Sequence, residues 1–298
     1  MEAAINERVN RWLTGAYDED TKAEIQRMKQ SSPEELADAF YKDLEFGTGG
    51  LRGIMGVGTN RMNKYTVAMA TQGLANYLKQ QFPGEEQKVV IAYDSRNNSR
   101  YFSEITADVL SANGMKVYVF DKITPTPELS FAIRYLHCHS GIVITASHNP
   151  KEYNGYKVYW NDGGQLVPPH DHRVIEEVKK ITRLSEVHFE RNEEKIAYIG
   201  EEVNVPYIEK VKALSMHPEI IQKQHNLKII YTPLHGTGVY MVPRALRAYG
   251  FNCVSLVEAQ AVPDGNFSTV VSPNPEEVAA MSMAIEQAKT NDADIVIA

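Results

Sequence analysis

The segment Thr145-Ala146-Ser147-His148-Asn149-Pro150, followed by Asn154-Gly155-Tyr156-Lys157, carries the residue types best suited to chemistry in this chain. It follows an apolar run over residues 141–145 that is typical of a strand. Ser147 is therefore expected on a loop at the carboxyl end of a strand, where ligands bind in α/β sheets. Pro150 cannot continue a strand ladder and restricts Asn149, which stiffens the loop. We predict that Ser147 is displayed to a ligand rather than packed into the core.

The Ser147 hydroxyl needs activation, because free serine is a weak nucleophile without a base, a metal ion or positive surroundings. His148 and Lys157 are the nearby candidates. Neighbouring residues of an extended segment point to opposite faces, so His148 need not contact the hydroxyl. The positions two before and two after Ser147 are not glycine, which disfavours the nucleophile elbow of a serine hydrolase. The pattern favours phosphoryl transfer, where positioning and charge neutralisation supply most of the catalysis.

A second candidate is Phe46-Gly47-Thr48-Gly49-Gly50-Leu51-Arg52-Gly53, because six of the 19 glycines fall within residues 47–58. Glycine lets the backbone approach an anion closely, so that successive N–H groups form a concave nest. Arg52 adds a planar guanidinium that is always charged. No Gly-Lys-Ser or Gly-Lys-Thr follows and no strand precedes, which disfavours a nucleotide site. The competing interpretation is a purely structural hairpin.

Two further loops remain open on sequence grounds. Asp94-Ser95-Arg96 follows another apolar run and fits either a brace for the active site or a salt-bridged surface turn. His235 and Thr237 lie in a glycine-flanked loop, which we interpret as packing between domains rather than catalysis.

The elements that must position these residues alternate between short apolar runs and helical stretches, which is typical of βαβ units. We predict the α/β fold class with two related domains, each a mixed or mostly parallel sheet with flanking helices, preceded by an N-terminal helical arm over the first 46 residues. The domains are placed at residues 1–200, which hold the arm and both candidate loops, and 201–298. Helices are expected over 65–80, 100–112, 128–135, 174–181, 242–249 and 276–289, and strands over 88–93, 115–120, 141–145, 227–231, 253–257 and 295–298.

Composition limits the class of partner. The chain has 298 residues with 31 basic and 38 acidic side chains, a net charge of −7, which disfavours nucleic acid and membrane surfaces. Two cysteines make no disulfide framework, and no leader or run of 18 apolar residues is present, so a cytoplasmic location is expected.

Residues 145–150, 154–157 and 46–53 resemble the α-D-phosphohexomutase superfamily of phosphoglucomutases and phosphomannomutases. Asn60-Arg61-Met62-Asn63 and Pro233-Leu234-His235-Gly236-Thr237-Gly238 are more similar to its phosphoglucomutase-2 and phosphopentomutase branch. The resemblance extends over essentially the whole chain.

The resemblance implies that Ser147 is a phosphoserine that exchanges its phosphoryl group with a sugar 1-phosphate or 6-phosphate through a bisphosphorylated sugar. Lys157 then matches the acid/base lysine, Arg52 the arginine close to the phosphoserine, and His148 the accompanying histidine. Substrate or phosphate binding is assigned to Thr48, Gly49, Gly50, Arg52 and Asn149. Glucose 1,6-bisphosphate is implied as the activator.

The family also binds Mg²⁺ through a phosphoserine oxygen and three aspartates, which implies Ser147 as a metal ligand through its phosphate. The aspartate loop should follow the strand that ends at Ala298, and Asp292 and Asp294 precede that strand. We therefore expect an N-terminal fragment that is inactive by itself. The alternatives are a phosphopentomutase, a glucose 1,6-bisphosphate synthase, a non-catalytic sugar-phosphate-binding module and, less in keeping with the motifs, a serine hydrolase.

Overall fold

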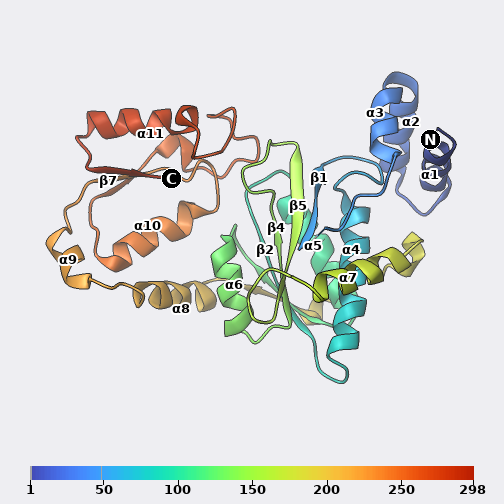
Figure 1. The fold of residues 1–298 in the computed structure, drawn as a ribbon, viewed down its shortest axis with the longest axis horizontal. Coiled ribbons are helices and arrows are strands. Elements are labelled where there is room, and N and C mark those ends of the chain that lie inside the picture. The colour runs from blue at the N-terminus through green and yellow to red at the C-terminus, as the bar shows by residue number, and fades with distance from the viewer. Residues whose placement is uncertain (1, 48) are drawn as a thin grey trace.

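The N-terminal arm is helical, as predicted. A computed structural model describes residues 2–47 and 49–298. Helices α1 (Glu2–Thr14), α2 (Glu19–Ser31) and α3 (Pro33–Phe40) pack together at one end of the molecule, drawn in blue in Figure 1. Helix α3 begins at a proline whose fixed φ suits the first turn of a helix. A buried aromatic cluster that includes Trp12, Phe40 and Tyr65 joins the arm to the rest of the chain.

A mixed sheet with the strand order β1-β5-β4-β2-β3-β6 forms the centre of the larger unit. Its parallel strands are β2 (Lys88–Tyr93), β3 (Lys116–Phe120), β4 (Ser140–Ile144) and β6 (Ile196–Ile199). Strands β5 (Tyr153–Trp160) and β1 (Gly50–Ile54) complete one edge in antiparallel pairing. The mixed, mostly parallel sheet that the sequence predicts is confirmed.

Helices cover both faces of this sheet (Figure 1). Helices α4 (Lys64–Gln81), α5 (Ser99–Ala112) and α7 (His170–Lys180) pack on one face and enclose the main apolar core. Helix α6 (Thr126–Tyr135) covers the other face, on the side of the smaller unit. Side chains alternate between the two cores along β2, since Val89 and Ile91 join the first cluster and Val90 and Ala92 join the second.

The smaller unit is a parallel three-stranded sheet with helices around it. Its strand order is β8 (Val254–Leu256), β7 (Ile229–Tyr231) and β9 (Ile295–Ile297). Helix α10 (Gly238–Tyr249) packs on β8, and α11 (Val278–Thr290) packs on β7 and β9. Helices α8 (Glu201–Lys212) and α9 (Pro218–Lys223) form the connection from the larger unit (Figure 1). Single turns of 3-10 helix occupy Leu184–Glu186, Glu193–Lys195 and Glu258–Gln260.

Two sequence interpretations need correction. The glycine-rich stretch is not only a loop, because residues 50–54 form β1 and pair with β5. Residues 196–212, for which the sequence predicts no element, form β6 and α8, and β6 joins the larger sheet beside β3. These elements escape a periodicity analysis because β6 is four residues long and α8 contains Pro206. Within the described residues, no helix is both long and apolar enough to span a membrane.

Glu128 on α6 makes a testable contribution to stability. Its side chain is buried, and its Oε1 atom has no hydrogen-bond partner in the described part of the chain. Burial raises the pKa of this carboxyl from 4.5 to about 7, while Arg244 on α10 lowers it and Glu201 on α8 raises it. Because the native state holds this proton more tightly than the unfolded chain, the free energy of unfolding decreases as pH rises from about 4.5 to about 7.

We expect Glu128→Gln to flatten that pH dependence and to increase the free energy of unfolding at pH ~8 by up to about 3 kcal/mol. Urea unfolding between pH ~5 and ~8 measures both effects. The exposed Glu209→Gln on α8 is the matched control and should stay within about 0.5 kcal/mol of wild type. An unaltered pH dependence in Glu128→Gln would show that this carboxyl is not the source.

Candidate functional site

Ser147 is exposed on the turn that leaves the carboxyl end of β4, where the sequence places it. Ala146 before it is buried, and Ser147 itself has a φ of 55°, a left-handed conformation that is uncommon for a residue with a side chain. The Ser147 N–H donates to Thr145 Oγ1 at 3.0 Å, and the Asn149 N–H donates to the Ala146 carbonyl at 3.1 Å. The turn therefore holds the hydroxyl outward.

His148 contacts Ser147, a contact that the argument from alternating faces left open. The distance between Ser147 Oγ and His148 Nδ1 is 3.3 Å. The argument from alternation does not apply, because Ser147 lies in a turn with positive φ rather than in an extended strand. The two side chains can thus share a proton, but among the residues that the structure describes no third group bonds to the His148 imidazole, as a catalytic triad would require.

Arg52 and Lys157 share one face of the sheet. Arg52 on β1 is opposite Gly155 on β5, and Lys157 is opposite both Gly50 and Val143. Directly opposite residues project from the same face, and so do residues two apart on a strand. Both cationic side chains therefore lie on the face of the sheet that α6 covers, beyond the part that α6 itself contacts. Gly155 lets the strands approach closely, since a Cβ there would lie 2.5 Å from the Thr145 carbonyl oxygen.

The two cations line a cavity of about 630 Å³, here called the lysine cavity. Gly49 and Gly50 line it as well, with φ values of 84° and 141°. Thr48, predicted as a phosphate-binding residue, lies outside the described residues. Burial lowers the pKa of Lys157, Arg52 lowers it further, and Asp94 opposes the shift. The lysine cavity thus combines a fixed positive charge with an amine that gives up its proton more readily than usual.

Ser147 and His148 line a separate cavity of about 350 Å³, here called the serine cavity, in which Arg52 and Lys157 have no part. Its walls come from loops at the carboxyl ends of strands in both sheets: Asp94 and Ser95 after β2, Thr145 after β4, Gly236 and Thr237 after β7, and Ala298 after β9. Asn149, predicted as a binding residue, lies in the same turn but does not line either of these cavities. The arrangement places the serine between the two units.

The loop of residues 233–238 faces the serine cavity, so packing between domains is not its only role. His235 is buried and contacts the Val262 carbonyl through Nδ1 and Thr269 Oγ1 through Nε2, both at 2.8 Å. These contacts fix the loop while Gly236 and Thr237 reach the cavity. From the sequence we assign Thr237 only a packing role, although it follows a strand of the second sheet much as Ser147 follows β4.

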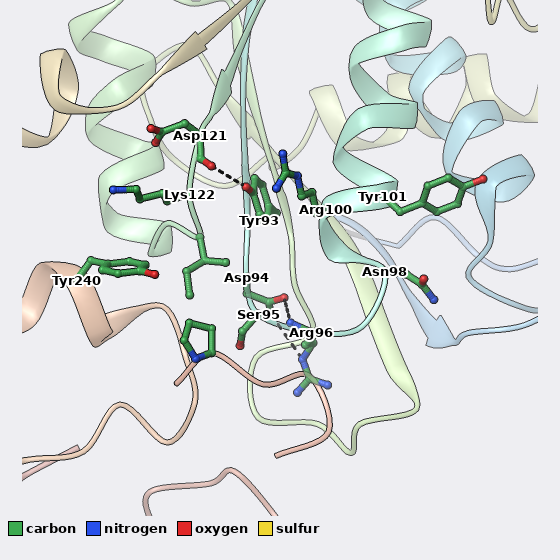
Figure 2. A pocket seen from close by; sticks show the side chains of 12 residues that line it. Tyr93, Asp94, Ser95, Arg96, Asn98, Arg100, Tyr101, Asp121, Lys122 and Tyr240 are labelled. Carbon is green, nitrogen blue, oxygen red and sulfur yellow. Dashed lines mark hydrogen bonds and ion pairs between the residues drawn. The ribbon is translucent and has the colours of Figure 1, made fainter. Parts of the chain in front are cut away.

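The Asp94-Ser95-Arg96 segment is a brace rather than a surface turn. The Arg96 side chain is only 1% exposed and that of Asp94 is 13% exposed, and Arg96 Nε lies 3.6 Å from Asp94 Oδ2. Figure 2 shows the pair at the wall of a further cavity of about 470 Å³, whose other lining includes Arg100, Lys122 and Tyr240. Burial raises the pKa of Asp94.

Asn154 provides a second brace beside it, because its buried amide donates to the Asn97 carbonyl at 3.0 Å and to Ser99 Oγ at 2.9 Å.

The residues present do not form a magnesium site by themselves. Across residues 2–47 and 49–298, no group of three or more His, Cys, Asp or Glu side chains is placed to hold a metal ion. A phosphate on Ser147 would add oxygen ligands, but of the described Asp and Glu side chains only Asp94 lines the same cavity.

Comparison with known proteins agrees with this architecture. Residues 43–185 match the family described as phosphoglucomutase/phosphomannomutase, alpha/beta/alpha domain I, and residues 205–298 match domain II of that family. A phosphoglucomutase of Staphylococcus haemolyticus is 42% identical over 263 residues, which cover 87% of this chain and 47% of that protein. One from Staphylococcus aureus is 41% identical over 272 residues, covering 90% and 48%. The chain thus spans about half the length of these relatives.

Solved structures share the fold. A protein titled putative phosphomannomutase from Thermus thermophilus aligns with a TM-score of 0.62 at 24% identity, covering 77% of this chain and 48% of that one. A phosphoglucomutase/phosphomannomutase family protein from Burkholderia thailandensis aligns with a TM-score of 0.63 at 23% identity, covering 84% and 51%. With both domain descriptions matched in order along most of its length, the chain belongs to the phosphoglucomutase/phosphomannomutase family.

Proposed function

We propose that this chain forms the phosphoserine half of a phosphosugar mutase that interconverts sugar 1-phosphates and 6-phosphates. The observation that carries the proposal is the position of Ser147, exposed on a left-handed turn in a cavity built from the carboxyl ends of strands in two sheets. This is where α/β proteins bind ligands. Curated relatives named phosphoglucomutase support the same activity.

In the proposed reaction, the bond between phosphorus and Ser147 Oγ breaks as a bond from phosphorus to a sugar hydroxyl oxygen forms. The proton of that hydroxyl passes to the neutral amine of Lys157, whose pKa burial lowers, and the resulting ammonium gives a proton to the departing Ser147 oxygen, so that serine leaves as a neutral hydroxyl. Arg52 offsets the charge of the phosphoryl oxygens, and in this proposal the substrate spans the lysine cavity and the serine cavity, which Asp94 connects because it lines the serine cavity and acts on the pKa of Lys157. The bisphosphorylated sugar then returns its other phosphoryl group to Ser147 by the reverse steps, so the net reaction is an isomerisation. His148 steadies the hydroxyl through its contact with Ser147 Oγ.

Further parts of the proposal follow from the family resemblance. We assign phosphate binding to Gly49, Gly50 and Asn149, Mg²⁺ as cofactor with the Ser147 phosphate among its ligands, and glucose 1,6-bisphosphate as activator. The division into domains at residues 1–200 and 201–298 and a cytoplasmic location are also proposals, the latter supported by the free cysteines Cys138 and Cys253. We also propose that the partners of the protein are sugar phosphates and that it has no role at nucleic acids or membranes.

A binding module without catalysis is the second candidate, favoured by the lack of a three-ligand metal group among the described side chains. One experiment separates the two. We expect the protein expressed from its complete gene, incubated with glucose 1,6-bisphosphate and Mg²⁺, to acquire one phosphate on the peptide that contains Ser147. Peptide mapping by mass spectrometry locates it, and Ser95 in the same cavity is the internal control. Bound ligand without phosphate on Ser147 would support the binding module and reject the mutase.

A further inference from the structure

Arg96 joins both ends of the serine loop through a single guanidinium. Its Nη2 donates to the carbonyls of Ser147, at 2.7 Å, and Asn149. Its Nη1 donates to the carbonyls of Pro150, at 2.9 Å, and Tyr153, at 3.2 Å. Since guanidinium is planar and rigid, these hydrogen bonds fix the carbonyls relative to one another. The conformation of residues 147–153 therefore depends on one side chain from a different loop.

The free-energy cost of burying the Arg96 guanidinium indicates that this residue has a role other than stabilising the fold. Its only ion-pair partner in the described chain is Asp94, whose Oδ1 also accepts from Ser99 Oγ at 2.6 Å and from the Arg96 N–H at 3.0 Å. Within residues 2–47 and 49–298, Arg96 Nε has no hydrogen-bond partner, and burial lowers the pKa of the guanidinium. A buried and incompletely paired charge is weak evidence for stabilisation, because desolvation offsets most of the attraction. What the arrangement provides is a defined loop geometry.

The smaller unit reaches the same guanidinium. The Phe267 ring lies with its centroid 5.1 Å from Arg96 Cζ, and Phe267 also lines the serine cavity. Next to it, Asn97 Nδ2 donates to Asn266 Oδ1 at 3.0 Å. Gly265 fits closely against this loop, since a Cβ there would lie 2.4 Å from Asn97 N. Residues 265–267 thus dock on the segment that holds the serine loop.

We propose that Arg96 is a positioning residue for Ser147 and that Phe267 couples the placement of the smaller unit to the geometry of the serine loop. The inference rests on the proposed function for the reaction that it aids. Arg96 does not touch the substrate in this scheme. It acts through the carbonyls of residues 147–153, so that the Ser147 hydroxyl meets the phosphoryl donor at the correct angle only when residues 265–267 are docked.

The test compares Arg96→Lys with wild type in the protein expressed from its complete gene. Lysine keeps the charge but cannot span four carbonyls as a planar fork. We expect the rate of Ser147 phosphorylation by glucose 1,6-bisphosphate to fall about 100-fold, the loss typical of a displacement near 1 Å. Hydrogen exchange of amides in residues 146–153 should become faster, and KM for the bisphosphate should change less than kcat. The exposed Arg100→Lys is the matched control and should stay within about twofold of wild type.

Two further variants keep the proposal testable if Arg96→Lys folds poorly. Gly265→Ala keeps the Arg96 guanidinium but forces residues 265–267 away from the backbone of Arg96 and Asn97, which would lie 2.9 and 2.4 Å from the new Cβ, and we expect the same faster exchange in residues 146–153 with a smaller loss of rate. In Arg96→Ala, millimolar guanidinium ion should restore part of the phosphorylation rate, whereas methylammonium should not.

The outcomes separate this proposal from the mutase assignment. Phosphorylation of Ser147 at the wild-type rate in Arg96→Lys, with unchanged exchange, would overturn the positioning role and leave the mutase intact. Faster exchange in the variants, combined with no phosphate on wild-type Ser147, would reject the mutase and retain Arg96 as the residue that shapes the loop.

Discussion

Replacing Ser147 with alanine is expected to reduce mutase turnover on the order of 10⁴-fold or more, because the phosphoryl group then has no oxygen to which it can return. Alanine fits the exposed site. The φ of 55° at this position is equally unfavourable for serine and for alanine, because both carry a Cβ, so the substitution should leave folding unaffected. A coupled assay for conversion of sugar 1-phosphate to 6-phosphate measures the loss.

The matched control is Ser95→Ala, which removes a second hydroxyl from the same cavity. It should retain turnover within a few-fold of wild type and still accept phosphate on Ser147. Comparable losses in both variants, or turnover within a few-fold of wild type in Ser147→Ala, would reject Ser147 as the group that carries the phosphoryl.

Lys157→Gln is expected to reduce kcat about 10²–10⁴-fold, the usual contribution of a positioned acid or base. The amine must be neutral to accept a proton, so kcat/KM should rise with pH through the pKa of Lys157. Burial and Arg52 lower that pKa from its ordinary value of 10.5, which brings this rise toward neutral pH. The pH profile of Lys157→Gln should lack the rise, and glutamine keeps much of the side-chain volume.

Two companion variants sharpen the assignment. Lys151→Gln changes an exposed lysine of the same segment and should leave both rate and pH profile unaltered. Arg52→Gln removes a charge that lowers the pKa of Lys157, so the rise in kcat/KM should move to higher pH. If Lys157→Gln retained the wild-type profile, the proton acceptor would have to be another group, and His148 would be the first candidate.

The sequence by itself determined the alternating helices and strands of residues 64–145 and the exposed position of Ser147 after the last of these strands. Residues 88–93 form β2 with the predicted bounds, and β4 ends one residue before the predicted end, so Ser147 leaves the sheet where expected. These features are local, because the structure of an apolar run bounded by polar residues and a proline depends mainly on residues close to it in the sequence. The helical start at Pro33 and the glycines of residues 47–58 carry the same kind of short-range information.

The tertiary structure decided which of these residues meet. Strand β6 pairs with β3 over more than 70 intervening residues, and β1 pairs with β5 over about a hundred, so neither partner can be derived from local pattern. The contact between Ser147 and His148 depends on a left-handed turn that alternation does not anticipate. Arg96 bonds to the Ser147 carbonyl from another loop, and Thr237 lines the same cavity from another sheet. Such contacts arise because the carboxyl ends of separate parallel strands converge in space, which residue spacing along the chain does not encode.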